Sequence, residues 1–230
     1  MKTICSLLIA VVLSVSCNDK KTENDVVESK VEFNQELATE LERMAQIDQI
    51  AAYKPEGDYK HYTGQEWIVF KDSVFTTHQK RLSELFDTHG YVGYDLVGEA
   101  GSNNFWLMVQ HSDHVPAFQE KVLKLMKVEV SNENADPRSY GLLVDRVKLN
   151  TGKPQVYGTQ VTYNMNNGQA YPKKLADSAT VNERRKSLGF ESLEDYLNDM
   201  SQSHFLMNQQ YYSEKGVTAP TFYATSSNEK

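Results

Sequence analysis

The sequence predicts a mainly α-helical single domain of five to seven helices with one small β-hairpin packed on them, an α+β arrangement. Apolar residues recur three and four positions apart through much of 33–150, which is the spacing of amphipathic helices. Strict alternation occurs only near 155–174, around the turn signal Asn166-Asn167-Gly168. About 210 residues can bury one hydrophobic core well, so we expect one domain.

The start of the chain predicts export. Lys2 precedes an apolar run at 4–15, which is shorter than the roughly 20 residues that a membrane-spanning helix needs. A basic start, a short apolar run and small residues at 14–16 are typical of a secretory signal. Cys17 follows at once, so the junction resembles a bacterial lipobox, with Ser14 where that pattern prefers leucine. We therefore predict cleavage before this cysteine and acylation of its thiol by palmitate-type chains.

The mature chain would hold one cysteine, Cys17, which is committed to lipid, so no disulfide can form within it. Asn18-Asp19 resembles the acidic signals that send some Bacteroidetes lipoproteins to the outer surface. We expect a lipid-anchored protein of the cell envelope, at the outer membrane, on its periplasmic face or at the cell surface. The predicted segments are a signal peptide at 1–16, the lipidated cysteine with a flexible tether at 17–32, a globular domain at 33–214 and a loose tail at 215–230.

The charge balance excludes one class of partner. The formal net charge is −7, and it becomes −8 once Lys2 is lost with the signal peptide. Binding to a phosphate backbone needs a basic footprint, so we expect no nucleic-acid partner. The expected partners are the membrane, through the N-terminal lipid, and an unknown small ligand or envelope protein. No cofactor is expected.

Two amphipathic helices open the predicted domain. The apolar residues of 33–51 follow one helical stripe, with Asn34 placed to cap its start and Pro-Glu-Gly at 55–57 breaking the pattern. A second helical face runs through 74–89, and Gly90 stands where a helix end favours a left-handed residue.

Less regular segments surround two further helices. The aromatic segment 59–67 could line a groove or cover the core. The glycine-rich segment 91–101 predicts a loop. The apolar run 105–109 predicts a helix buried on every side, and Pro116 predicts the first turn of the next one. The polar stretch 131–138 then ends this half of the domain.

The middle of the chain predicts the hairpin. The spacing at 140–147 favours a helix, although 144–149 could also form a strand. Alternation over 155–163 predicts a strand, and its return strand falls near 169–174. Gly158 inside the first strand indicates a bulge or a close backbone approach.

Two helices close the domain. The first is short, ends at Leu188 and has Asp177 or Ser178 as its N-cap. Ser192, three residues before an aspartate, opens a longer helix whose apolar stripe extends to Tyr211.

Polar residues gather at the end of the buried helix. Gln110, His111, Asp113 and His114 follow its last apolar residue, which would place them inside the domain or on the floor of a cleft. A transition-metal site usually needs three or four ligands with supporting partners, and the sequence has no second histidine or cysteine cluster. We therefore predict no metal site and regard His111 as a candidate acid–base group.

A second polar group surrounds Asp145-Arg146. Neighbours on one helix point about 100° apart, so these two side chains need separate partners. One interpretation is an internal ion-pair network that fixes the packing of helices and hairpin. The other is a pocket in which the arginine binds an anionic group. Candidate partners are Arg184 and Arg185 for the carboxylate, and Asp48 and Asp113 for the guanidinium.

Three stretches resemble a known family: 107–119 (LMVQHSDHVPAFQ), 144–160 (VDRVKLNTGKPQVYGTQ) and 182–196 (NERRKSLGFESLEDY). Their QHxD, DR and QxYGTQ spacing resembles a bacterial family known as domain of unknown function 6624, over most of 33–207. An arginine expected shortly after Asp48-Gln49 is absent. The family implies no activity. The residues that match it are Gln110, His111, Asp113, Asp145, Arg146, Gln155, Tyr157, Gly158, Thr159, Gln160 and Arg185.

The sequence leaves different classes of function open and does not decide whether the protein is an enzyme. One hypothesis is a polar pocket that binds a small ligand, with an anionic ligand as the class that an arginine favours. The alternative is a structural or protein-interaction lipoprotein whose polar cluster is internal scaffolding. A further alternative is a hydrolase-like enzyme that uses His111 as acid and base, with Asp113 and Asp145 as further candidates. The predicted ligand-binding residues are Gln110, His111, Asp145, Arg146, Gln155, Tyr157, Gln160 and Arg185.

Overall fold

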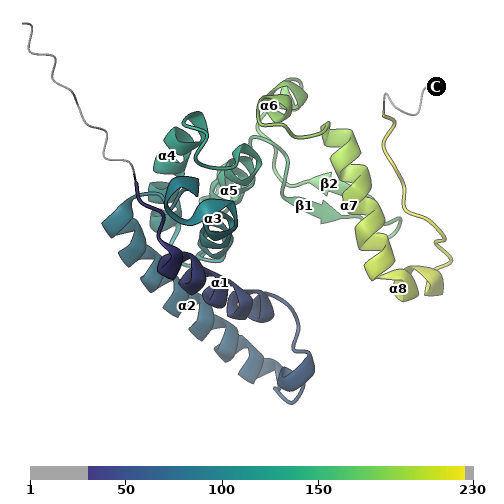
Figure 1. Cartoon of the computed structure of the whole chain (residues 1–230). Helices are drawn as coiled ribbons and strands as arrows, with labels where there is room; N and C mark the ends of the chain where they lie inside the picture. Colours follow the sequence, from purple (N-terminus) through teal and green to yellow (C-terminus); the bar gives the residue numbers. More distant parts are fainter. Residues whose placement is uncertain (1–30, 226–230) are drawn as a thin grey trace, which may run out of the picture. The chain divides into compact units, whose positions relative to one another are not determined.

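A computed structural model describes residues 31–225 of the 230-residue chain, within one compact unit that begins at Val31. This part contains eight α-helices, one short 3-10 helix and one two-stranded antiparallel sheet, so the prediction of a mainly α fold with a small hairpin is confirmed. In chain order the elements in Figure 1 are α1 (Gln35–Ala52), η1 (Gly57–Tyr59), α2 (Gly64–His89), α3 (Tyr94–Gln110), α4 (Pro116–Ser131), α5 (Pro137–Asn150), β1 (Val161–Tyr163), β2 (Ala170–Pro172), α6 (Val181–Ser187), α7 (Leu193–Met207) and α8 (Gln209–Glu214).

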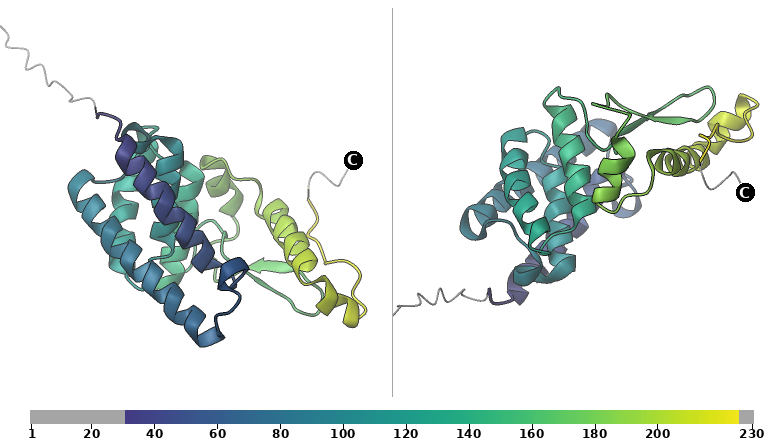
Figure 2. Two further views of the ribbon diagram at one scale, coloured as in Figure 1. Left: turned by 60° about the horizontal axis from the view of Figure 1, so that its bottom comes forward. Right: turned by 90° about the horizontal axis from the view of Figure 1, so that it is seen from above.

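The first five helices enclose the main core. α1 packs on both α2 and α3, and α4 packs on α5 (Figure 2). As predicted, the side chain of Asn34 caps α1 by accepting a hydrogen bond from the backbone N–H of Leu37 at 2.9 Å. Residues with no exposed surface, such as Leu41, Phe105 and Leu143, lie in this cluster. Hydrophobic burial here therefore holds the helical part together.

The second helix begins inside the segment whose sequence is aromatic and irregular. Thr63 and Glu66 form a reciprocal capping box, which satisfies backbone N–H groups at the start of α2. The helix then runs for 26 residues and ends, as predicted, at Gly90 with a φ of +74°.

The loop predicted at 91–101 is wrong, because α3 already begins at Tyr94. Two of its glycines lie inside this helix. Gly98 has a φ of +72° and interrupts the helical backbone. A Cβ at Gly101 would lie 2.7 Å from that of Val97 and 3.7 Å from that of Ala38 on α1. A larger residue here would therefore clash with Val97 beside the kink, whereas the distance to α1 is an ordinary van der Waals contact.

The next two helices start at prolines, where the missing N–H costs nothing. Pro116 begins α4 as predicted. α5 extends from Pro137 to Asn150, so the helix favoured by the spacing at 140–147 is confirmed and the strand alternative at 144–149 is excluded.

The strands are shorter than the alternation predicts. β1 covers only three residues, and it pairs with β2 in the register Val161 with Pro172, Thr162 with Tyr171 and Tyr163 with Ala170. Residues 155–160, predicted to be strand, form a bent segment with one parallel bridge from Gln155 to Leu175. Side chains rather than a neighbouring strand bind much of its backbone, as described below.

The C-terminal elements form a second, smaller hydrophobic cluster around Ala170, Val181, Leu193 and Leu197. α6 begins at Val181, with Thr180 at the N-cap position, so the predicted cap at Asp177 or Ser178 is wrong. The carboxylate of Asp177 instead accepts hydrogen bonds within the preceding turn.

α7 begins as predicted, with the hydroxyl of Ser192 accepting a hydrogen bond from the backbone N–H of Asp195. In place of a loose tail after Gly216, the segment up to Thr225 contacts the hairpin and α7. Asn198 hydrogen-bonds both backbone groups of Tyr223, and the Tyr223 hydroxyl donates to the carbonyl of Ala170 at 2.9 Å.

Candidate functional site

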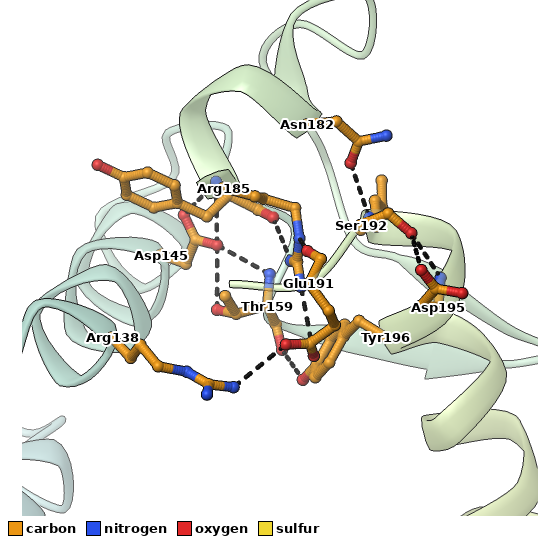
Figure 3. A network of polar contacts seen from close by, with 11 residues as sticks. Arg138, Asp145, Thr159, Asn182, Arg185, Glu191, Ser192, Asp195 and Tyr196 are labelled. Carbon is orange, nitrogen blue, oxygen red and sulfur yellow. Dashed lines mark hydrogen bonds and ion pairs between the residues drawn. The ribbon is translucent and has the colours of Figure 1, made fainter. Parts of the chain in front are cut away.

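Asp145 holds the bent segment 155–160 against α5. Its side chain has no exposed surface. The carboxylate accepts hydrogen bonds from the backbone N–H groups of Val156 (2.6 Å), Tyr157 (3.0 Å) and Thr159 (2.9 Å), and from the Thr159 hydroxyl (3.0 Å). Figure 3 shows this carboxylate directed at the segment. A buried carboxylate with four donors is a structural anchor.

Gln155 closes the same segment from within. Its side-chain amide donates to the carbonyls of Gln160 (2.9 Å) and Lys173 (2.8 Å) and accepts from the backbone N–H of Gln160 (2.9 Å). The residue is fully buried. It therefore ties 155–160 to the residue that follows β2, and its amide group does not face solvent.

Arg185 of α6 binds the outer side of the segment. Its Nε donates to the carbonyl of Glu191 (2.8 Å) and its Nη1 to the carbonyl of Tyr157 (2.7 Å). The guanidinium lies between the rings of Phe190 (5.1 Å) and Tyr196 (4.9 Å), as cation–π pairs do. Burial lowers the pKa of Arg185, while the carboxylate of Glu191 opposes that shift.

Tyr196 completes this network (Figure 3). Its hydroxyl donates to the carbonyl of Thr159 at 2.7 Å, and burial raises its pKa to about 12. The hydroxyl therefore stays protonated and acts as a donor at neutral pH. The ring of Tyr157 is half-buried and packs near Phe190.

The partners predicted for Asp145 are wrong. Neither Arg184 nor Arg185 forms an ion pair with it; Arg184 donates to the carbonyl of Val156 and contacts Asp177. Backbone N–H groups replace the expected cations because the bent segment 155–160 leaves them without strand partners. Asp145, Gln155 and Arg185 thus bind backbone groups of the protein itself.

His111 lies in a different environment, at the C-terminal end of α3. Its Nδ1 is 2.5 Å from a carboxylate oxygen of Asp48, which is fully buried on α1. The other oxygen lies 3.6 Å from Nδ1 of His78 on α2. Burial raises the pKa of Asp48, but the contacts with His111 and His78 outweigh it and hold the pKa below its usual value. The ring of His111 also stacks on Phe75.

Sequence reasoning missed Asp48 and His78 as partners of His111, although a signal was present. Asp48 falls on the apolar stripe of α1, three residues after the buried Ala45. His78 falls on the apolar face of the second helix. A polar residue on a buried stripe requires a partner inside the domain. Two such residues on neighbouring helices, Asp48 and His78, therefore indicate a polar cluster between the helices that a third polar residue can join.

Asp113 and Arg146 form a bidentate pair at the surface. Nε and Nη2 of the arginine donate to the two carboxylate oxygens at 2.8 and 2.6 Å, so the predicted pairing of these residues is confirmed. Asn150 and Gln119 also donate to this carboxylate, at 2.7 and 3.1 Å. The carboxylate therefore has four donors and holds the guanidinium in one orientation.

An open polar hollow of about 460 Å³ lies beside this pair. We call it the polar hollow. Two of its side chains are cationic, Arg146 and Lys173, and one is anionic, Asp113. The residues that line it are Asp113, Arg146, Leu149, Asn150, Gln160 and Lys173.

The predicted site residues therefore separate into three groups: one buried around 155–160, one at His111 and one at the polar hollow. Asp145, Gln155 and Arg185 are buried in the scaffold around 155–160. His111 pairs with Asp48 and is not among the residues that line the polar hollow.

Of the predicted ligand-binding residues, only Arg146 and Gln160 face the polar hollow. Asp113, which was a catalytic candidate, lies beside them. Gln110 is half-buried, and its backbone carbonyl accepts a hydrogen bond from Gln119. Sequence reasoning missed Lys173 and Asn150; Lys173 lies one residue after β2, so only the pairing of the hairpin brings it here.

Residues 31–225 contain neither a metal-binding cluster nor a membrane-spanning helix. No group of three or more histidine, cysteine, aspartate or glutamate side chains in this range is arranged to hold a metal ion. None of the helices in the same range combines the length and apolar character required to cross a membrane. The predicted lipid acceptor, Cys17, lies outside the described residues.

Comparison with known proteins identifies one family. The model of a family described as "Family of unknown function (DUF6624)" matches residues 35–208, from the start of α1 to the residue before α8. No curated protein and no solved structure matches the chain. Because the family model covers well over half of the chain, the protein belongs to family DUF6624.

Proposed function

We propose that this protein is a lipid-anchored envelope protein whose polar hollow binds a small ligand with an anionic group. The observation that carries the ligand class is the balance of charge in the hollow. Arg146 and Lys173 face it, against the single carboxylate of Asp113. That carboxylate already accepts four hydrogen bonds, so the hollow presents a positive surface to a ligand.

The guanidinium of Arg146 supports the proposal by its orientation. Two of its nitrogens bind Asp113, while Nη1 has no hydrogen-bond partner within the described part of the chain. A guanidinium that is already fixed loses little side-chain entropy when it binds a ligand. Lys173 likewise has no ion pair within 31–225, so its ammonium group is available to a second anionic oxygen.

The surrounding sequence adds to the positive field. Residues 146–176 contain five lysine and arginine residues and no aspartate or glutamate, in a chain whose net charge is −7. These cations are Arg146, Lys148, Lys153, Lys173 and Lys174. A local excess of one sign attracts ligands of the other sign and raises their rate of association.

Binding of inorganic phosphate, measured by titration calorimetry at low salt, tests this assignment. Lys173→Ala should weaken phosphate binding about tenfold, because one charge-assisted contact contributes roughly 1.4 kcal/mol. Lys174→Ala is the matched control, since the neighbouring lysine does not line the hollow; it removes the same charge from the field without a direct contact and should weaken binding much less than Lys173→Ala does. Equal loss in both variants, or no phosphate binding by the wild type, would contradict the site.

The lipid anchor is proposed from the sequence around Cys17. The apolar run before it and the small residues at 14–16 support cleavage and acylation at this position. Metabolic labelling with a palmitate analogue should mark the wild type and not Cys17→Ser. Membrane fractionation should place the wild type in the outer membrane and release the variant.

A structural role is the second candidate function, and one observation favours it. Asp145, Gln155 and Arg185, which sequence reasoning placed in a ligand site, bind backbone groups of the protein itself. An acid–base role for His111 has less support, because this residue does not line the polar hollow.

A further inference from the structure

The first half of α2 and the segment before it form an aromatic surface outside the main core. Ring centroids in this group lie 5.1 to 6.0 Å apart. None of its members belongs to the hydrophobic cluster of α1 to α5. We call it the aromatic tip; its residues are Tyr53, Tyr59, Tyr62, Trp67, Ile68, Val69 and Phe70.

Much of this apolar surface is open to solvent. The exposed fractions are 71% for Tyr53, 48% for Ile68 and 60% for Val69. Two hollows flank the rings, one of about 500 Å³ beside Tyr53 and Tyr59, and one of about 410 Å³ beside Tyr62 and Val69. Contiguous apolar surface of this kind marks a contact site for a partner or a membrane.

We propose that the aromatic tip docks onto the lipid–water interface of the membrane that anchors the protein. Tyrosine and tryptophan favour this interface because their rings are apolar and their polar atoms remain hydrated. The hydroxyls of Tyr59 and Tyr62 have no hydrogen-bond partner among residues 31–225, so they can bind headgroups. Trp67 is buried against the rings of Tyr59 and Tyr62, and its indole N–H donates to the carbonyl of Tyr53 at 2.9 Å, so it brings no unmet donor to the apolar layer.

The charges around the aromatic tip favour a zwitterionic lipid interface over a strongly charged partner. Three lysines lie within 54–72, together with four acidic residues, so the surface is nearly neutral. The lysine side chains can place their apolar stems along the interface and their ammonium groups in water. The residues are Lys54, Lys60 and Lys71, with Glu56, Asp58, Glu66 and Asp72.

The chain before α1 is long enough to allow this contact. This step rests on the proposed acylation of Cys17. Fourteen residue steps separate Cys17 from Val31, and they can span up to about 50 Å when extended. α1 has 18 residues and is therefore about 27 Å long. The tether is thus long enough for the aromatic tip, which begins at the end of α1, to reach the bilayer that holds the lipid.

Vesicle sedimentation of the chain from Asn18 onward tests the docking without any acyl group. The compact unit begins at Val31, so this chain retains the whole core. The wild type should partition onto phosphatidylcholine vesicles, and Val69→Glu should reduce the partition coefficient at least fivefold. Val128→Glu, at a residue 53% exposed on α4, is the matched control and should bind as the wild type does.

Fluorescence supplies a second readout. Vesicles with brominated acyl chains should quench the tryptophan emission of the wild type. Trp67→Phe should remove most of that quenching, because Trp67 packs directly against the rings of the aromatic tip, whereas Trp106 packs within the main core. No vesicle binding by the chain from Asn18, or equal binding by Val69→Glu and the wild type, overturns the proposal.

A third result would also overturn the proposal. If Lys173→Ala loses vesicle binding and Val69→Glu retains it, the polar hollow binds the headgroups and the aromatic tip does not. Acylation of Cys17 is absent from this assay. A failure here would therefore leave the proposed anchor intact.

Discussion

Asp145 is the residue on which the segment 155–160 depends most directly. Asp145→Ala removes the acceptor for three backbone N–H groups, and Asp145→Asn turns an amide N–H₂ toward the same donors. We expect either change to lower the free energy of unfolding by at least ~2 kcal/mol, because buried donors lose their partner. Urea denaturation measures the loss. Asp199→Asn, at an exposed position on α7, should change it by less than about 0.5 kcal/mol.

Asp48 should make stability depend on pH in the acid range. Its pKa in the folded protein lies below the usual value, so it contributes stability that is fully present above its unfolded pKa of about 3.9. The contribution is lost as the pH falls through the folded pKa. Melting temperatures of the wild type and Asp48→Asn should therefore differ at pH 5 to 7 and converge toward pH 2.

Two outcomes would contradict this account of Asp48. The first is a constant difference between the wild type and Asp48→Asn across the whole pH range. The second is an equal effect from Asp87→Asn, at an exposed position on α2.

At the scale of elements, the close approach of the bent segment to α7 depends on Gly158. Its φ is +74°, and a Cβ would lie 2.7 Å from a methyl group of Leu193. Gly152 has the same φ with open space around it, so Gly152→Ala reports the backbone cost alone. We expect Gly158→Ala to lower the free energy of unfolding, measured by urea denaturation, by about 1–3 kcal/mol more than Gly152→Ala does. The added methyl group would overpack the core around Leu193. Equal losses would show that the backbone conformation alone requires this glycine.

The elements themselves were largely predictable where the signal is local. Asn34, Pro116 and Ser192 begin helices as predicted, because a cap or a first-turn proline acts within three or four residues. The errors arose where tertiary contacts override local preference. Gly98 and Gly101 indicated a loop, yet they lie within α3, where one permits a kink and the other leaves room for the side chain of Val97 in the main core.

At the scale of the molecule, the C-terminal segment should contribute to stability. Deletion of 217–230 removes the hydrogen bonds of Tyr223 with Asn198 and Ala170, and it uncovers the hairpin at Gly168, which Pro220 contacts. We expect the melting temperature to fall by several degrees, since a loss of about 1–3 kcal/mol has this effect in a domain of this size.

If the chain that ends at Gly216 melts at the same temperature as the full chain, the segment does not stabilise the hairpin.

Sequence alone determined the helical class, the starts of α1, α4 and α7 and the place of the hairpin, because spacing and capping act over a few residues. It also identified many of the polar residues that matter, but it joined them into one site. The tertiary structure alone decided their partners: Asp145 with backbone N–H groups, His111 with Asp48, and Arg146 with Asp113. The physical reason is distance along the chain. Asp48 lies 63 residues from His111, and only the packing of α1 on α3 places the two side chains together.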